Sequence, residues 1–464
     1  MTSFAFAAAA ALGALGLWWF VPRLRSWPPS LGLLIAVLTV VPPHQAAAFG
    51  IGADDVLFVL GLVLLLPHAL ARGTLDKVPY GRALAVGAGL LAAGATVSAF
   101  VNGESLTDTA DLLVRGPGRI LLYVAMVLVV VAQVPSARTR EVVARGLAAV
   151  GTFESVVSLL AYFVGLPGGF GLQEAQGNTT LVGEIPGRVT GTLDLSPNFL
   201  GALLVLSVPV TLGIALDAAS RRLRVGWALA VVVQLAALVL TYTRSSLAVT
   251  LLACVVLIAL RGRVRWLAVG GVVLAGLLFF TPAFERFTSD STDRMALYVS
   301  AIRVFVDHPI AGVGPGEQAR FTAADPERYR ATPFGVAGNN AHNTVLLAGA
   351  ENGVLGLLGA VVLNLALVAV AIAVIRRARA VARASGERRM EPLGIGVAML
   401  AFVSQGMANN LFTVTLTASA LVMLVGGCAL PWLDAGQRCP DPVGGPEDES
   451  AAATGESDRS RAHR

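Results

Sequence analysis

A histidine at the start of an apolar run is the side chain in this sequence best suited to proton transfer. His342 lies in the stretch NNAHNTVLLAGAENGVLG, which runs from Asn339 to Gly356. Histidine exchanges a proton near neutral pH, so a histidine beside a substrate hydroxyl can act as a general base. The neighbouring asparagines, including Asn340 and Asn343, are residue types that cap a helix N-terminus. The same pattern also fits a purely structural histidine.

Glu351 is the carboxylate of the same apolar run. If one continuous helix begins at His342, the two side chains are nine residues apart, about half a turn out of phase at about 100° per residue. They then do not share a face. Glu351 is therefore expected to bind a neighbouring helix or backbone, and to support the site rather than take part in the chemistry.

Three arginines next to apolar runs are candidates for binding an anion. Arg188 opens RVTGTLDLSPNFLG, Arg244 lies between two apolar runs in TYTRSSLA, and Arg294 opens the stretch DRMALYVSAIRVFVDHPIAGVGPGEQ. A guanidinium binds phosphate oxygens through two parallel hydrogen bonds. Each of the three could also be an interfacial arginine that reaches towards lipid headgroups. Together with His342, they indicate base-assisted attack on a lipid-anchored substrate activated by a diphosphate.

A glycine-rich turn, GVGPG, follows Arg294 along the chain. Gly314 and Gly316, with Pro315 between them, predict a tight turn whose backbone N–H groups could approach an anion. No Rossmann strand precedes it, which excludes the dinucleotide interpretation, although a plain turn remains an alternative. The nearby carboxylates are scattered and lack metal-ligand spacing, so we expect neither a metal nor a cofactor; they are Asp290, Asp293 and Asp307.

The elements that must position these residues are membrane-spanning helices. The chain has 464 residues, of which 55% are hydrophobic and only 14% are charged, against roughly a quarter charged in soluble domains. Its mean hydropathy is +0.73. Runs of roughly 17–25 apolar residues are long enough to cross a bilayer. We therefore predict an all-α polytopic membrane protein with about 12–13 spans, at approximately 3–21, 30–48, 55–71, 83–101, 118–134, 142–166, 194–216, 225–242, 245–260, 266–281, 342–375, 393–407 and 411–431.

The basic loops predict the orientation of these spans. Arginine-rich loops alternate along the chain, which places them in the cytoplasm by the positive-inside rule. The loops 102–117, 167–193, 243–244 and 282–341 then face outward, and the C-terminus lies inside. The net charge of +5 is explained by these loops and gives no reason to expect a nucleic acid. We expect residues 1–434 to form one transmembrane bundle, and residues 435–464 to form a disordered cytoplasmic tail.

The outward segment 282–341 is the largest interruption of the apolar pattern. Loops of this length are usually functional or disordered. Within it, Asp293–Val306 has the apolar spacing of an amphipathic helix that lies on the membrane surface or packs on the bundle.

The order of these motifs resembles the O-antigen ligase / O-antigen polymerase family over roughly Pro186–Leu411. The resemblance is carried by the Arg–Ser–Ser hairpin, by HPI-GVGPG, and by the HN-x-x-L-x-x-x-x-E-x-G-x-x-G stretch that contains His342. It implies about a dozen spans and a large extracytoplasmic loop, similar to GT-C glycosyltransferases of the bacterial inner membrane. Family members move a glycan from an undecaprenyl-diphosphate carrier to an acceptor hydroxyl without a metal. Ligases use lipid A–core as acceptor, polymerases use another carrier-linked chain, and some relatives use proteins.

Carried over by motif, His342 is the candidate general base, and Arg188, Arg244 and Arg294 are the candidates for the diphosphate. The resemblance leaves open which two of the three arginines dominate, and whether the enzyme is a ligase or a polymerase. Asn343, Glu351, Gly314 and Gly316 are supporting residues.

Two other classes of membrane protein are alternatives to a glycan-transferring enzyme. One is a transporter or flippase of a lipid-linked or anionic solute, which should carry ionisable residues mid-membrane on broken helices. The polar groups here gather at the outer ends of the spans, which favours the enzyme. The other is a cell-wall polymerase of the shape-and-division type, whose motifs this sequence lacks.

Overall fold

The structure is a computed structural model, and it describes a large part of the chain. The described residues are 80–133, 137–166, 170–173, 179–180, 183–184, 187–193, 196–262, 292–329, 340–386, 389–411, 420–422 and 424–434. The predicted spans 3–21, 30–48, 55–71 and 266–281, and the predicted tail 435–464, lie outside them.

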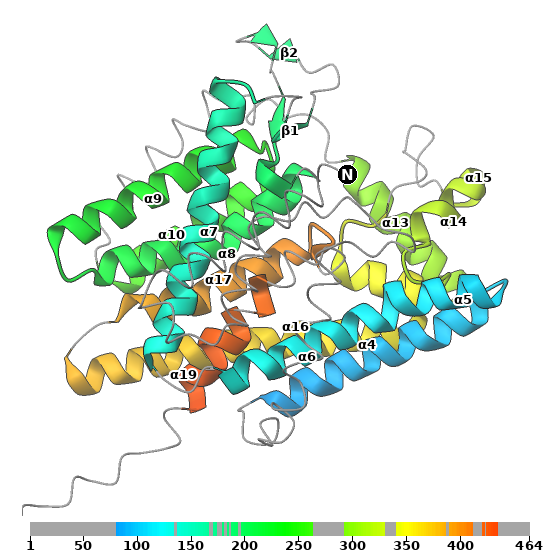
Figure 1. Ribbon diagram of the computed structural model, residues 1–464. Helices are drawn as coiled ribbons and strands as arrows, with labels where there is room; N and C mark the ends of the chain where they lie inside the picture. The colour runs from blue at the N-terminus through cyan, green and yellow to red at the C-terminus, as the bar shows by residue number, and fades with distance from the viewer. Residues whose placement is uncertain are drawn as a thin grey trace, which may run out of the picture.

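The described residues include five helices that are long and apolar enough to cross a membrane. Shorter apolar helices accompany them, including α10 (Arg244–Leu260). All strands in the described ranges are two residues long. The predicted class, an all-α polytopic membrane protein, is thereby confirmed, and Figure 1 shows the bundle. The long helices are α4 (Gly81–Asn102), α7 (Ala137–Phe163), α8 (Pro197–Asp217), α9 (Arg221–Leu240) and α16 (Thr344–Ser385).

Helix α8 is the centre of the bundle. It is apolar on all sides. Of its most apolar stretch, 83% is buried, as expected for a helix surrounded by other helices. It packs against α7, α9, α10 and α17 (Met390–Gly406). Ser196 caps its N-terminus by accepting a hydrogen bond from the Asn198 N–H, and Pro197 occupies the first turn, where it needs no N–H partner.

The segment predicted as loop 102–117 is mostly helical, so its prediction as a loop was wrong; its outward orientation stays a prediction. Ser105 caps α5 (Leu106–Leu113) through its hydroxyl, which accepts from the Asp108 N–H at 3.1 Å. The chain then continues through a π-helical turn, η3 (Val114–Gly118), into α6 (Arg119–Gln133). Pro117 lies inside η3. Because proline has no N–H to donate, it interrupts the α-helical ladder, and a π-turn is one way to absorb the interruption.

Helices α4 and α16 approach each other closely through glycines. A Cβ atom built on Gly94 would lie 2.5 Å from the Gly356 nitrogen, and one on Gly87 would lie 2.6 Å from the Leu363 nitrogen. Larger residues at these positions would push the two backbones apart. Small residues are the usual means of close helix packing in membranes.

Helix α16 is longer than predicted and is broken near its start. The sequence predicted a run over 342–375, whereas the helix spans Thr344–Ser385 and contains a non-helical residue, Gly353, with φ 65° and ψ −158°. Its last part extends through the Arg376–Ser385 stretch, since arginine and alanine are good helix formers. The break divides α16 into a short first part before Gly353 and a long second part.

The two long loops carry small elements: strands beside α7, and three helices at the end of the bundle where α4 ends and α16 begins. Segment 167–193 contains two antiparallel ladders, β1 (Leu172–Gln173) with β4 (Arg188–Val189), and β2 (Thr179–Thr180) with β3 (Gly183–Glu184). Segment 282–341 contains α13 (Thr292–Asp307), α14 (Gln318–Ala324) and α15 (Pro326–Tyr329). Figure 1 shows these three helices together at that end.

The predicted amphipathic helix at Asp293–Val306 is confirmed as α13. One face is buried, with Leu297, Ala301 and Val304 inside, and the helix packs against α16. A second apolar stripe is exposed, formed at helical spacing by Met295, Val299, Ile302 and Val306.

Candidate functional site

His342 lies immediately before α16, in a segment fixed on both sides. The backbone N–H of Ala341 donates to Gln318 Oε1 at 2.9 Å. On the other side, Asn343 Oδ1 accepts from the first N–H groups of α16 and so caps the helix, while its Nδ2 donates to the Met407 carbonyl at 3.0 Å. His342 itself has φ 43°, a left-handed conformation that non-glycine residues adopt seldom. Its neighbours therefore hold a half-buried imidazole in a fixed and strained backbone position.

His342 is not part of the helix, because α16 begins at Thr344 and Asn343 is its N-cap; the helical phase predicted for a helix that starts at His342 therefore does not apply. Glu351 instead contacts the glycine-rich turn. Its carboxyl accepts hydrogen bonds from the backbone N–H groups of Gly316 and Gln318. Its backbone carbonyl accepts from Ser98 Oγ of α4 at 2.6 Å. This agrees with the expectation that Glu351 binds backbone and a neighbouring helix. Gln318 in turn accepts from Ala341, so Glu351 supports the residue that precedes His342.

The GVGPG turn fits into the break of α16. Val313 N donates to the Ala350 carbonyl at 3.1 Å, Gly314 N to the Glu351 carbonyl at 3.1 Å, and Val354 N to the Pro309 carbonyl at 2.8 Å. The N–H groups of Gly314 and Gly316, which were expected to face an anion, thus donate to Glu351 instead. The break exposes carbonyls of α16, and the turn satisfies them.

Replacing Gly353 is expected to destabilise the protein. Gly353→Ala adds a Cβ against the Ile310 carbonyl, at a residue with φ 65°, so we expect a loss of about 1–3 kcal/mol in unfolding free energy. The measurement is the thermal unfolding midpoint of the purified protein in detergent. Gly89→Ala is the matched control, because nothing lies within 4 Å of its added Cβ, and alanine favours a helix interior by about 1 kcal/mol. Equal midpoints for the two variants would contradict the structural role of the break.

Arg188 lies at the turn that carries Arg244. Its Nε donates to the Thr241 carbonyl at 2.9 Å and its Nη2 donates to Thr243 Oγ1 at 3.2 Å. Thr243 is the N-cap of α10, and Arg244 is the first residue of that helix. The turn between α9 and α10 therefore comprises Thr241–Thr243, with Tyr242 left-handed at φ 50°, rather than the predicted 243–244. Two arginines are thus brought to one helix N-terminus.

A buried glutamate of α7 anchors the segment that follows Arg188. Glu154 is completely buried. Its Oε2 accepts from the Thr192 backbone N–H at 2.8 Å, and its Oε1 accepts from Thr192 Oγ1 at 2.5 Å. Thr192 belongs to η5 (Gly191–Leu193), which follows β4. The sequence interpretation did not single out Glu154, although an acidic residue inside an apolar run was the available signal.

The segment Gln405–Asn410, at the end of α17 and just beyond it, connects the candidate residues to one another. Gln405 Nε2 donates to Ser246 Oγ at 2.8 Å, two residues after Arg244. The Met407 carbonyl accepts from Asn343 beside His342, and from Tyr298 OH on α13 at 2.8 Å. The polar run SQGMANN between two apolar runs could have revealed this segment, but the sequence interpretation missed it.

Arg294 lies in the first turn of α13, one turn before Tyr298, and its side chain is not among those described.

An ion pair holds α15 to α13 beside this site. Arg328 Nε donates to Asp307 Oδ2 at 3.0 Å, and this hydrogen bond lowers the pKa of Asp307 below its ordinary value.

Across the described ranges, no three His, Cys, Asp or Glu side chains gather as a metal site would require.

The class of protein defined by this fold and site is an all-α polytopic membrane protein with a histidine and arginines grouped at one end of its bundle. The family model described as O-antigen ligase matches residues 229–361 of this chain. The matched stretch contains Arg244, Arg294, the GVGPG turn, His342 and Glu351. The predicted family resemblance is therefore confirmed over that stretch. Curated proteins gave no match to the chain.

Proposed function

We propose that the protein is a membrane glycosyltransferase of the O-antigen ligase or polymerase type. It would move a glycan from an undecaprenyl-diphosphate carrier to an acceptor hydroxyl, without a metal. The observation that carries the proposal is the grouping of Arg188 and Arg244 at the N-terminus of α10, linked through Gln405–Asn410 to the loop of His342.

The N-terminus of α10 suits the diphosphate. The first N–H groups of a helix and its dipole attract phosphate oxygens. Thr243 caps α10 without a side-chain hydrogen bond to these groups. Arg188 and Arg244 add positive charge at the same place, and Arg294 is the third candidate, on α13. When the bond between the sugar and the diphosphate breaks, negative charge develops on the leaving group, and fixed cationic donors stabilise it.

His342 is assigned the role of general base. An acceptor hydroxyl is a weak nucleophile, and a neutral imidazole can remove its proton as the new glycosidic bond forms. The proton passes to His342, the sugar passes to the acceptor oxygen, and the diphosphate leaves on its lipid. Asn343, Gln318 and Glu351 hold the backbone around the histidine.

The proposal places the site on the extracytoplasmic side of a bacterial inner membrane and the C-terminus in the cytoplasm. This follows from the alternation of arginine-rich loops. The break in α16 and the buried Glu351 also fit a transporter, which uses broken helices at its binding site. In this protein the GVGPG turn fills the break with backbone hydrogen bonds, which favours the enzyme.

A transfer assay in proteoliposomes tests the function. The full chain is reconstituted with a glycan on undecaprenyl diphosphate, and with either lipid A–core or a second carrier-linked glycan as acceptor. We expect a lengthened or transferred glycan with one acceptor, and the same rate in the presence of a chelator. Movement of the donor across the bilayer without any transferred product would instead support the transporter. Activity that is lost with a chelator and restored by Mg²⁺ would contradict the metal-free mechanism.

A further inference from the structure

The first part of the GVGPG turn is held by two helices of the bundle. Asn102 Nδ2, at the end of α4, donates to the Gly312 carbonyl at 3.3 Å. The next two N–H groups of the turn donate to carbonyls in the break of α16. The second part, Pro315–Gly316, leads into α14, whose first residue Gln318 accepts from the residue before His342. The position of this second part therefore affects the His342 segment.

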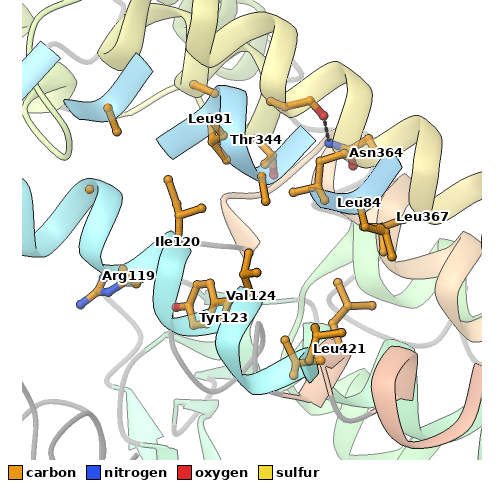
Figure 2. A pocket seen from close by; sticks show the side chains of 18 of the residues that line it. Leu84, Leu91, Arg119, Ile120, Tyr123, Val124, Thr344, Asn364, Leu367 and Leu421 are labelled. Carbon is orange, nitrogen blue, oxygen red and sulfur yellow. Dashed lines mark hydrogen bonds between the residues drawn. The ribbon is translucent and has the colours of Figure 1, made fainter. Parts of the chain in front are cut away.

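The second part of the turn faces a cavity. Among the described residues, this cavity lies between α4, α6 and α16, and Pro315–Gly316 line it together with Thr344, the first residue of α16. Figure 2 shows Thr344 on the α16 side of the cavity, and Ile120 and Tyr123 on the α6 side. A void offers no packed atoms that resist displacement. The position of the turn on this side must depend on the neighbour that does touch it.

That neighbour is the π-turn η3, which contacts Pro315 through Gly116. A Cβ atom built on Gly116 would lie 2.7 Å from Pro315 Cγ and 2.8 Å from Pro315 Cβ, whereas ordinary contacts begin at 3.4 Å. Only glycine at this position allows η3 to approach the turn so closely. Any larger residue must displace either η3 or the turn.

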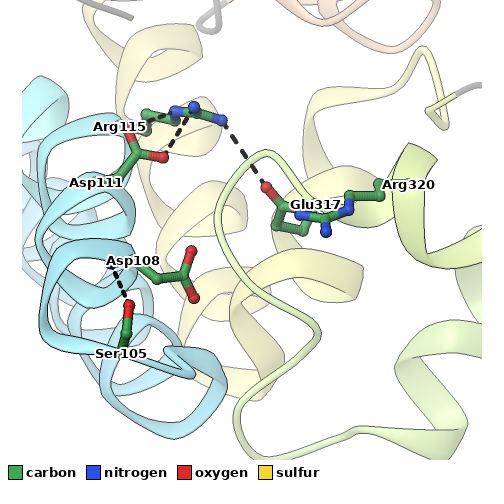
Figure 3. Close-up of polar contacts among 6 residues, drawn as sticks. All are labelled: Ser105, Asp108, Asp111, Arg115, Glu317 and Arg320. Atoms are coloured by element: carbon green, nitrogen blue, oxygen red, sulfur yellow. Dashed lines mark hydrogen bonds and ion pairs between the residues drawn. The ribbon is translucent and has the colours of Figure 1, made fainter. Parts of the chain in front are cut away.

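An arginine adds a charged link between the same two segments. Arg115 Nη1 lies 3.8 Å from Glu317 Oε1, which belongs to the N-cap residue of α14. Asp111 orients this arginine, because it accepts from Arg115 Nε at 3.0 Å and pairs with Nη2 at 2.8 Å. Arg320 also pairs with Glu317, at 3.5 Å, but from within α14. Figure 3 shows that Arg115 reaches Glu317 from the opposite segment.

We propose that Gly116 and Arg115 are positioning residues for the general base. Through them, η3 holds the second part of the GVGPG turn and the start of α14, and so keeps the His342 segment in place. The inference rests on the proposed function, in which His342 removes a proton from the acceptor. A base must lie within hydrogen-bond distance of that proton, and a displacement of about 1 Å lowers a rate by as much as about 10²-fold.

Gly116→Ala tests the contact with the turn. The added methyl group must push Pro315 away, so we expect the transfer rate at saturating donor to fall by at least about tenfold, with an unchanged donor affinity. Gly118→Ala is the matched control, because it alters the same π-turn and its Cβ meets only Leu113, at 3.0 Å from the carbonyl oxygen. Equal rates for the two variants, or a loss of donor affinity in Gly116→Ala, would overturn the positioning role.

Arg115→Ala covers the case in which Gly116→Ala fails to fold. An exposed ion pair accounts for up to about a fivefold effect, so we expect the transfer rate to fall by about two- to fivefold. Arg320→Ala is the control, since it removes the other arginine on Glu317 and leaves the link to η3 in place. Equal transfer rates for Arg115→Ala and Arg320→Ala would exclude Arg115 as a positioning residue.

A spectroscopic measurement separates this inference from the proposed function. The chain has five histidines, and the ring resonance that His342→Ala removes from the NMR spectrum of the ¹³C-histidine-labelled full chain in detergent belongs to His342. We expect Gly116→Ala to shift this resonance and the midpoint of its pH titration, and Gly118→Ala to leave both unchanged. A shift in a chain that transfers no glycan would support the link and contradict the proposed function. An unshifted resonance in Gly116→Ala would overturn the link, whether or not the chain transfers glycan.

Discussion

His342→Ala is expected to lower the rate of glycan transfer by about 10²–10⁴-fold, the usual contribution of a general base. The residue precedes α16 and is fixed by the contacts of Ala341 and Asn343, none of which uses the imidazole. These contacts persist in the variant, so we expect it to remain folded and to bind the donor. The measurement is the single-turnover rate in proteoliposomes at saturating donor, together with the thermal unfolding midpoint.

His308→Ala is the matched control for this experiment. His308 follows α13, and its ring stacks edge-on against Phe321, so it belongs to the packing of the loop helices. We expect its variant to retain a transfer rate close to that of the wild type. Normal transfer by His342→Ala would exclude this histidine as the base. Loss of donor binding by the same variant would show instead that it belongs to the donor site.

Arg244→Ala is expected to reduce transfer by about 10²–10³-fold, comparable to removing one fixed donor from a developing oxyanion. Arg244 begins α10, next to the cap residue that Arg188 contacts. In the proposed mechanism, two cations and a helix N-terminus act there on the diphosphate. Arg244→Lys should recover only part of the activity, because an ammonium cannot form the paired hydrogen bonds of a guanidinium.

The measurement for Arg244 is the affinity for the undecaprenyl-diphosphate donor and the transfer rate, determined separately. Arg222→Ala is the control, since Arg222 is an exposed arginine in the first turn of α9, at the opposite end of that helix. If Arg244→Ala and Arg222→Ala both have the donor affinity and the transfer rate of the wild type, Arg244 is not part of the site.

The class of fold could be predicted from the sequence because hydropathy over about 20 residues decides whether a helix can enter a bilayer. The boundaries of α4, α8 and α9 agree with the predicted runs to within a few residues. The amphipathic spacing that predicted α13 is equally local. These properties depend on side chains close together in the chain, and so the sequence contains them directly.

The interior of the loops could not be predicted in the same way. Helix α5 and the π-turn at Pro117 occupy a segment that hydropathy assigns to a loop, because polar caps and tertiary packing form them. The break at Gly353 depends on backbone contacts with Val313 and Pro309, some forty residues earlier in the chain. No periodicity in α16 reveals it.

The sequence by itself determined that this is a helical membrane protein, and which histidine and arginines carry the candidate chemistry. The tertiary structure alone decided how they are held: Glu351 on the GVGPG turn, Glu154 on Thr192, and Met407 between α13 and the His342 segment. It also revealed the cavity beside Thr344. Residue type and hydropathy are properties of the chain, whereas these contacts join groups that are distant in sequence, and only packing brings them together.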